Sequence, residues 1–251
     1  MPPDFHEMPN GRRIACRFTP GAGPTLVFLP GYMSDMAGAK AQALFDWAQT
    51  NARACLLLDY SGCGASPGDF AQGTLSRWRD EVLAVIAARV PGPVVMVGSS
   101  IGGWLMLLVA LKLPPEQVAG LVGIAAAPDF TDWGFDLAEK SELSGGRTIY
   151  RANAYGPEPT PTHALFWADG QSQLLLGGAP SLLQAIALDC PVRLLHGQAD
   201  TDVPWQTSLR LAGALRSAQV QVTLVKDGDH RLSRPQDVAL LIANVAGLAP
   251  G

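Results

Sequence analysis

The sequence predicts an α/β fold in which a doubly wound, mostly parallel sheet carries helices on both faces. Short, continuous apolar runs of strand length alternate with longer amphipathic runs of helix length along most of the chain. Continuous apolar strands are typical of parallel sheets, because their central strands are buried on both faces. Of the 251 residues, 48% are hydrophobic and 16% are charged, which is ample for a sizeable core. We therefore expect one domain over residues 1–251, with right-handed crossovers between its parallel strands.

Six apolar runs are the strand candidates, and their length favours strands over helices. They lie at 25–29, 54–59, 94–98, 119–126, 191–195 and 220–225.

Five longer runs between the strand candidates are the helix candidates, at 37–49, 74–89, 101–112, 205–217 and 234–247. Apolar residues recur at helical spacing after Thr74, which is a favoured capping residue. The last helix is expected to open at Ser233, with Pro235 in its first turn, where proline is tolerated.

One segment interrupts the alternation. Residues 128–180 are rich in glycine, proline and aromatic residues and are too long for an ordinary connection. The strand–helix pattern resumes after them, so we expect an irregular insertion that forms a cap or lid within the single domain.

A candidate nucleophile stands where the strand 94–98 meets the helix 101–112. Gly98, Ser100 and Gly102 form the G-x-S-x-G pattern of a nucleophile elbow, in which the serine takes a strained backbone position. Counting from Ser99 instead puts Ile101 where the second glycine is required. We therefore predict Ser100 as the nucleophile, with helix capping as its competing role.

A serine hydroxyl needs a base to take its proton, and three histidines follow residue 100. His163 lies in the insertion, where mobility makes a poor base, and His196 at a strand end suits a structural role. His230 lies between the last strand and the last helix, at the carboxyl edge of the sheet where α/β folds bind ligands. We predict His230 as the base.

A carboxylate is needed to orient that histidine, and in this kind of fold it precedes the histidine in the chain. Asp200 and Asp202 both follow the strand 191–195, and Asp202 stands where it could cap the next helix. We favour Asp200, with Asp129 a distant third candidate, and expect Asp59 and Asp229 to be structural.

Two backbone N–H groups are needed to bind a developing oxyanion. One is expected from Ile101, directly after the nucleophile, and the other from Tyr32, after the turn at Gly31. The Tyr32 side chain is a candidate for the pocket wall, with core packing as the alternative.

Composition and charge exclude several other functions. The net charge is −4, the pI is near 5.5, and no basic run is longer than two residues, which argues against nucleic acid as a partner. No apolar stretch approaches the roughly 20 residues of a membrane span, so we expect no integral membrane association. The four cysteines are widely spaced, and we expect reduced thiols and a cytoplasmic location. We expect no cofactor and no metal, because no Cys/His cluster offers a site.

These segments together resemble a known family. "PGYMSDMAG", "DYSGCGASPG", "GSSIGGWLML", "RLLHGQADTDVPW" and "DHRLSRP" are similar to motifs of the α/β-hydrolase superfamily, and more narrowly of the mitochondrial palmitoyl-protein thioesterase and acyl-glucuronide esterase family. The resemblance covers residues 10–247 and is weakest in the insertion. It places the triad on Ser100, Asp200 and His230, and the oxyanion donors on Tyr32 and Ile101. No mitochondrial presequence is visible, and the composition indicates a bacterial, cytosolic relative.

The expected activity is hydrolysis of a carboxylic ester or thioester through an acyl-enzyme. The substrate classes implied are acyl-proteins, acyl-thioesters and acyl-glucuronides. A short-chain carboxylesterase, a C–C bond hydrolase or a cofactor-free haloperoxidase would use the same triad, so these alternatives stay open. A binding module on the same scaffold would be expected to lose a triad member.

An apolar acyl pocket is expected from aromatic residues of the insertion and the core face, although each of them also suits ordinary packing. The candidates are Trp104, Trp133, Phe135, Phe166, Trp167 and Trp205. An acidic leaving group would need a cation, for which the candidates are Arg147, Arg151 and Arg231.

Overall fold

The centre of the molecule is an eight-stranded mixed sheet with the strand order β1-β2-β4-β3-β5-β6-β9-β10. The computed structural model describes residues 2–153, 156–177 and 185–249. The strands β1 and β2 are antiparallel to each other, β2 is antiparallel to β4, and all later pairs are parallel. The strands are β1 (Asp4–Glu7), β2 (Arg13–Thr19), β3 (Ala22–Leu29), β4 (Arg53–Leu58), β5 (Val94–Ser99), β6 (Val118–Ile124), β9 (Val192–Gly197) and β10 (Val220–Val225).

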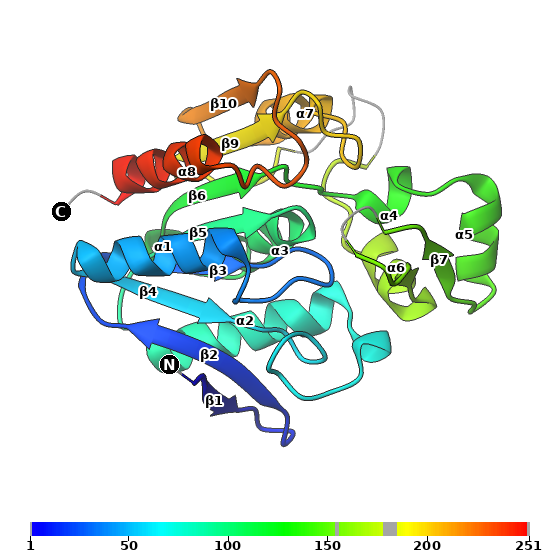
Figure 1. The fold of residues 1–251 in the computed structure, drawn as a ribbon, viewed down its shortest axis with the longest axis horizontal. Coiled ribbons are helices and arrows are strands. Elements are labelled where there is room, and N and C mark those ends of the chain that lie inside the picture. Colours follow the sequence, from blue (N-terminus) through cyan, green and yellow to red (C-terminus); the bar gives the residue numbers. More distant parts are fainter. Residues whose placement is uncertain (1, 154–155, 178–184, 250–251) are drawn as a thin grey trace.

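Five long helices cover the two faces of this sheet (Figure 1). They are α1 (Ala39–Thr50), α2 (Leu75–Arg89), α3 (Ile101–Ala110), α7 (Gln206–Ala214) and α8 (Pro235–Leu248). Helices α1 and α8 pack on one face, where Leu44 and Val245 join the core beneath them. Helices α2, α3 and α7 pack on the other, around the fully buried rings of Trp78 and Trp104. Thr74 caps α2 as predicted, because its Oγ1 accepts from the N–H of Arg77.

All six predicted strands and all five predicted helices are present, but three details differ. Strands β1 and β2 were not predicted, because charged residues interrupt their sequences and leave only short apolar runs. Strand β10 is not buried on both faces, since it forms the edge of the sheet. The last helix has Arg234, not Ser233, at its N-cap, and the carboxylate of Asp237 accepts from the Arg234 N–H.

The insertion is not irregular, as the sequence suggested, but is built from short regular elements. Between β6 and β9 the chain forms α4 (Phe130–Trp133), α5 (Leu137–Ser144), β7 (Ile149–Arg151), β8 (Thr160–Thr162) and α6 (Ala164–Gln171). Strands β7 and β8 form a separate antiparallel pair. We call residues 128–153 and 156–177 the cap; residues 154–155 and 178–180 of the predicted insertion lie outside the described residues. The cap lies beyond the carboxyl ends of β5, β6 and β9 (Figure 1).

The state of the cysteines and the character of the helices complete the description of the fold. Cys16, Cys55, Cys63 and Cys190 are all free thiols. Within the part of the chain that the structure describes, no helix combines the length and the apolar character that a membrane crossing requires.

Candidate active site

Ser100 stands between β5 and α3 in a strained backbone conformation. Its φ is 55° and its ψ is −120°, a combination that residues with a Cβ rarely adopt. The N–H of Ser100 donates to the carbonyl of Ile124, at the end of the neighbouring strand β6, with a distance of 2.9 Å. The turn therefore lifts the serine hydroxyl out of the sheet at its carboxyl edge.

The two glycines of the pattern are required by close backbone contacts. A Cβ at Gly98 would lie 2.4 Å from the carbonyl oxygen of Gly102, and a Cβ at Gly102 would lie 2.2 Å from that of Leu29. Both distances are well inside van der Waals contact, and the atoms met are backbone atoms that cannot rotate away. Strand, turn and helix can pack at this spacing only when both positions lack a side chain.

His230 lies in the loop between β10 and α8 and faces Ser100. Its Nε2 is 3.1 Å from Ser100 Oγ, and its Nδ1 is 2.8 Å from Asp200 Oδ2. Because a carboxylate only accepts, Nδ1 carries the proton and Nε2 is left to accept from the serine hydroxyl. The His230 side chain is 14% exposed and that of Asp200 is fully buried.

Asp200 lies in the loop after β9 and is held by four hydrogen-bond donors. Its Oδ1 accepts from the backbone N–H groups of Asp202 and Val203, at 2.8 and 2.9 Å. Its Oδ2 accepts from His230 and also lies 3.1 Å from His196 Nε2. Burial by itself raises the pKa of Asp200, but the hydrogen bonds from His196 and His230 outweigh it and hold that pKa well below its usual range. The carboxylate therefore stays ionised beside His230.

The loops that carry Asp200 and His230 are joined by backbone hydrogen bonds. The N–H of Gln198 donates to the carbonyl of Val225, and the N–H of Ala199 donates to the carbonyl of Gly228. These bonds continue the pairing of β9 with β10 beyond the end of the sheet. The carboxylate and the imidazole are thereby placed opposite each other.

The two predicted oxyanion donors lie beside the nucleophile. Ile101 is the first residue of α3, where a backbone N–H has no acceptor within the helix. Gly31 brings the loop after β3 close to Ser100, since a Cβ at Gly31 would lie 3.4 Å from that of Ser100. Tyr32 follows directly, and both Tyr32 and Ile101 line the same cavity as Ser100 and His230.

The Tyr32 ring also packs in an aromatic cluster that joins the core to the cap. Its centroid is 5.0 Å from that of Phe70 and 4.8 Å from that of Phe166 on α6. Trp78 of α2 completes the cluster, 5.8 Å from Phe166. Burial raises the pKa of Tyr32, so its phenol stays neutral at ordinary pH. The cap therefore supports the loop that carries one predicted oxyanion donor, Tyr32.

The remaining candidates from the sequence, His163, Asp129 and Asp202, have contacts of their own. His163 is at the N-cap of α6, where its Nδ1 contacts Thr148 Oγ1 at 3.0 Å. Asp129 is buried and accepts from the N–H groups of Leu175 and Leu176. Asp202 is exposed and does not cap α7, whose N-cap is Trp205.

Two aspartates expected to be structural accept backbone hydrogen bonds. Asp59 accepts from the N–H groups of Met36 and Ala65, and Asp229 accepts from that of Leu232.

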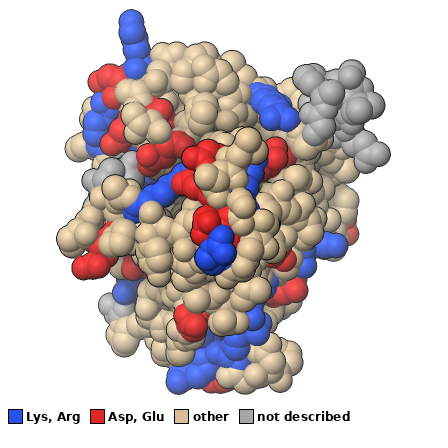
Figure 2. All heavy atoms as spheres, turned by 90° about the vertical axis from the view of Figure 1, so that its right-hand side faces the viewer, with Lys and Arg blue, Asp and Glu red and all other residues tan. Residues whose placement is uncertain are grey.

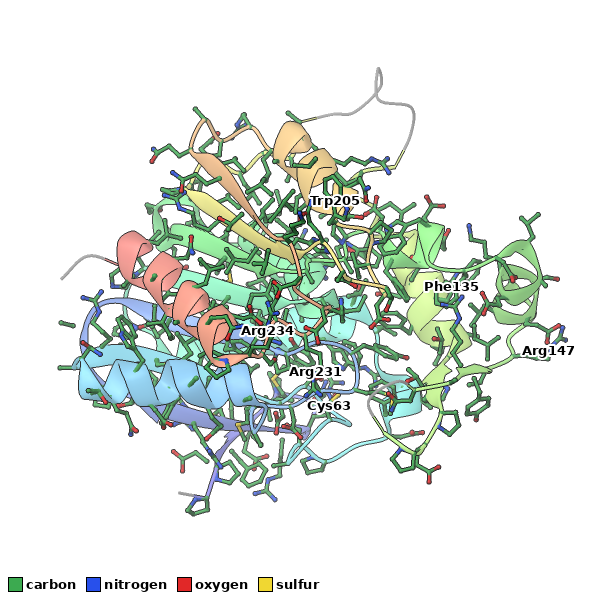
Figure 3. The ribbon with its side chains drawn as sticks, turned by 45° about the horizontal axis from the view of Figure 1, so that its top comes forward. Cys63, Phe135, Arg147, Trp205, Arg231 and Arg234 are labelled. Carbon is green, nitrogen blue, oxygen red and sulfur yellow. The ribbon has the colours of Figure 1, made fainter. Side chains whose placement is uncertain are left out.

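A cavity of about 600 Å³ opens over Ser100. Phe130 and Phe135 of the cap line it, together with Met33 of the loop after β3. The other predicted pocket aromatics, Trp104, Trp133, Phe166, Trp167 and Trp205, do not line it. Three of them donate instead to carbonyls: Trp104 to Gln173, Trp133 to Pro128 and Trp167 to Thr131. Phe166 is in the aromatic cluster, and Trp205 precedes α7 at a distance from Phe135 (Figure 3).

The three predicted arginines fall in different places. Arg151 and Arg231 line the cavity, whereas Arg147 lies at the outer end of the cap (Figure 3). Arg147 is exposed and paired with Glu142, and Arg151 is paired with Glu139. Such pairs make the outer face of the cap a mixture of basic and acidic side chains (Figure 2).

A further cation in the cavity, Lys40 of α1, was not found from the sequence. Its Nζ donates to the carbonyl of Arg231 and to Ser233 Oγ. Burial, reinforced by the charge of Arg231, lowers the pKa of Lys40 to about 8. No motif marks this lysine, and only the packing of α1 against the His230 loop brings it to the site. Among the described residues, no three His, Cys, Asp or Glu side chains are grouped to hold a metal ion.

The mostly parallel sheet, the strained serine and the serine–histidine–aspartate arrangement are typical of an α/β hydrolase. A model of the alpha/beta hydrolase family matches residues 26–240, and the chain belongs to this family.

Within the family, the chain is similar to mitochondrial palmitoyl-protein thioesterases. It is 35% identical over 250 residues to the human palmitoyl-protein thioesterase ABHD10, covering 97% of this chain and 79% of the human protein. The mouse protein of the same name is 38% identical over 248 residues, covering 96% and 80%.

Two solved structures agree closely with the fold. A putative hydrolase from Agrobacterium vitis S4 superposes with a TM-score of 0.90 at 37% identity, covering all of both chains. The mouse alpha/beta hydrolase domain-containing protein 10 gives a TM-score of 0.88 at 34% identity, covering 98% of this chain and 97% of that one.

Proposed function

We propose that this chain hydrolyses carboxylic esters or thioesters through an acyl-enzyme formed on Ser100. The observation that carries the proposal is the unbroken series of contacts from Ser100 Oγ through His230 to Asp200 Oδ2, at 3.1 and 2.8 Å. A hydroxyl, an imidazole and an ionised carboxylate in that order supply a nucleophile, a general base and a group that orients the base.

Acylation begins when Ser100 Oγ attacks the substrate carbonyl carbon and its proton passes to His230 Nε2. The carbonyl oxygen becomes an oxyanion, which the backbone N–H groups of Tyr32 and Ile101 bind. Asp200 holds the imidazolium that forms. His230 then gives its proton to the leaving alcohol or thiol as the bond to that group breaks, which leaves the acyl group on Ser100.

Deacylation uses the same groups with water in place of the leaving group. His230 Nε2 takes a proton from water, and the hydroxide that forms attacks the acyl carbonyl. The proton then returns to Ser100 Oγ, and the carboxylic acid leaves.

The proposed substrates are acyl-proteins and other acyl-thioesters, together with acyl-glucuronides. The relatives are named palmitoyl-protein thioesterases, which supports the thioester class. The cavity combines the apolar Phe130, Phe135 and Met33 with the cations Lys40 and Arg231. Apolar walls suit an acyl chain, and cations beside the nucleophile suit a leaving group that carries a carboxylate.

The test is labelling by a serine-reactive fluorophosphonate, followed by intact mass, on the wild type and on Ser100→Ala. Ser99→Ala is the matched control, because it removes the adjacent hydroxyl from the same strand end. The wild type and Ser99→Ala should each gain one label, and Ser100→Ala none. Hydrolysis of p-nitrophenyl esters and acyl-thioesters of graded chain length should fall at least about 10⁴-fold in Ser100→Ala.

The same panel identifies the substrate class. A preference for long acyl-thioesters supports the acyl-protein class, whereas turnover confined to acetyl and butyryl esters indicates a short-chain carboxylesterase. A wild type that neither labels nor hydrolyses any member of the panel would show that the hydrolase proposal is wrong.

A further inference from the structure

His196 is a fully buried second histidine in contact with Asp200, and the mechanism above does not use it. It lies on β9, four residues before Asp200, and its Nε2 is 3.1 Å from Asp200 Oδ2 and 3.0 Å from the carbonyl oxygen of Val203. On the other side of the ring, Nδ1 is 2.7 Å from the hydroxyl of Ser208 on α7. Every polar atom of the ring therefore has a partner.

The partners determine where the His196 proton lies. Nε2 faces two oxygens that only accept, an ionised carboxylate and a carbonyl, so Nε2 carries a hydrogen. Nδ1 faces a hydroxyl, which can donate to it. A neutral ring satisfies all these contacts, and a charged ring with no exposed surface would be costly. The hydroxyl of Ser208 thereby selects the form of His196 that donates to Asp200.

Asp200 Oδ2 consequently receives an N–H group from each of two imidazoles, His230 and His196. Its Oδ1 already receives two backbone N–H groups. A carboxylate offers about four lone-pair positions, so the carboxylate is saturated and cannot turn away from His230. The second imidazole also shares the negative charge of Oδ2, which weakens the attraction of that oxygen for a protonated His230.

We propose that His196, its proton placed by Ser208, is a positioning residue that fixes Asp200 and sets the pH range in which His230 acts as a base. The inference rests on the proposed function, because it assigns His230 the role of base. Without the His196 N–H, Asp200 Oδ2 acts on His230 alone. His230 then keeps its proton to a higher pH. In a plot of kcat/KM against pH, the acidic limb therefore moves to higher pH.

Other charged groups also act on His230, and they are the same in the wild type and in variants of His196. Asp229 and Arg231 are its neighbours in the chain, Lys40 comes from α1, and Asp35, Arg151 and Asp202 line the same cavity. The hydrogen bonds of the His196 ring go to Asp200, Val203 and Ser208. A shift of the acidic limb on changing His196 therefore acts through Asp200.

The experiment compares His196→Met, which fills a similar space without an N–H group, with His196→Gln, whose amide reaches toward the position of Nε2. In His196→Met, we expect kcat at pH 7 to fall about tenfold to a hundredfold, with KM within about threefold. The acidic limb of its kcat/KM profile should move to higher pH by about half a unit. The kcat of His196→Gln should stay within about threefold of the wild-type value, and its acidic limb should lie at the wild-type pH.

Two further variants separate positioning from packing. Leu194→Ala removes a buried side chain from the same face of β9 and should lower Tm without moving the acidic limb. Ser208→Ala removes only the hydroxyl that orients His196 and should move the limb upward by less than His196→Met. If His196→Met does not fold, an unchanged profile in Ser208→Ala overturns the proposal.

The remaining outcomes are also decisive. A limb in His196→Met that coincides with the wild type, or a loss in His196→Gln as large as in His196→Met, shows that His196 only fills space. The titration of His230, followed by NMR in the Ser100→Ala background, reads the same shift without turnover. It therefore tests the role of His196 even if the wild type proves inactive on the panel, which would overturn only the proposed function.

Discussion

The loops at the carboxyl edge of the sheet and the cap above them are held together in different ways. The elbow relies on backbone contacts with no room for one added carbon, since a Cβ at Gly102 would lie 2.2 Å from the Leu29 oxygen. The cap relies on short helices, edge-to-face aromatic contacts and exposed ion pairs such as Arg147 with Glu142. We therefore expect substitutions at the edge to cost stability, and substitutions in the cap to change the cavity that Phe130 and Phe135 line.

The largest effect is expected from Gly102→Ala at the edge. Its Cβ would meet the backbone oxygens of Leu29 and Pro30, neither of which can move without shifting β3. We expect a loss of about 3 kcal/mol in the free energy of unfolding and a fall in Tm of about 6–12 °C, measured by calorimetry.

The matched control for that prediction is Gly247→Ala in α8, where an added Cβ meets no atom within 4 Å. Alanine there should be neutral or stabilise the helix by up to about 1 kcal/mol. Equal Tm values for the two variants would contradict the tight packing of the elbow.

The next effect is expected in the cap, from Phe135→Ala. Phe135 lines the cavity and packs 5.1 Å from the Phe130 ring. Removing the ring enlarges the acyl space, so the preferred acyl chain should lengthen and kcat/KM for the best wild-type ester should fall about tenfold. Trp133→Ala is the control, because Trp133 also packs on Phe130 but does not line the cavity. If both variants shift the chain-length optimum alike, the shift does not come from the cavity wall.

A smaller, pH-dependent effect is expected from Lys40. Burial lowers the pKa of this amine to about 8, so the cavity loses a positive charge as the pH rises from 7 to 9. KM for a substrate with a carboxylate in its leaving group should rise about fivefold over that range, and Lys40→Met should remove the dependence. KM for a neutral p-nitrophenyl ester should not show this rise between pH 7 and 9.

The pH dependence of stability distinguishes weaker substrate binding from unfolding as the cause of the rise in KM. Between about pH 8 and the ordinary lysine pKa of 10.5, the unfolded chain binds more protons at this position than the folded chain. The Lys40 contribution to stability therefore becomes more favourable as the pH rises through that window. A fall in Tm accompanying the rise in KM would indicate another cause.

The smallest effect is expected from Arg147→Ala at the outer end of the cap. Arg147 and Glu142 are both largely exposed, so water and salt screen their attraction. Tm should match the wild type within error, and kcat/KM should stay within about twofold. A larger loss for an acidic substrate would mean that Arg147 reaches the substrate after all.

The difference between the two regions also explains how far the sequence could be interpreted. Ser100 was predicted from the G-x-S-x-G pattern after a strand, and Asp200 and His230 from the loops that follow two later strands, because parallel strands end at one edge of a sheet. The cap aromatics carried no such signal: Phe135 reaches the cavity, whereas Trp133, two residues earlier, donates its indole N–H to the carbonyl of Pro128. Aromatic residues suit both a pocket and a core, so composition could not separate them.

The sequence by itself determined the α/β fold, the strained turn at Ser100 and the chain order of serine, acid and histidine. These depend on local spacing and on glycines that a backbone contact requires, so they are visible along the chain. Only the tertiary structure decided that His196 shares the Asp200 carboxylate with His230 and that Lys40 stands beside the His230 loop. Those contacts bring together side chains from different strands, helices and loops, and no pattern in the sequence records which histidine or lysine will meet which partner.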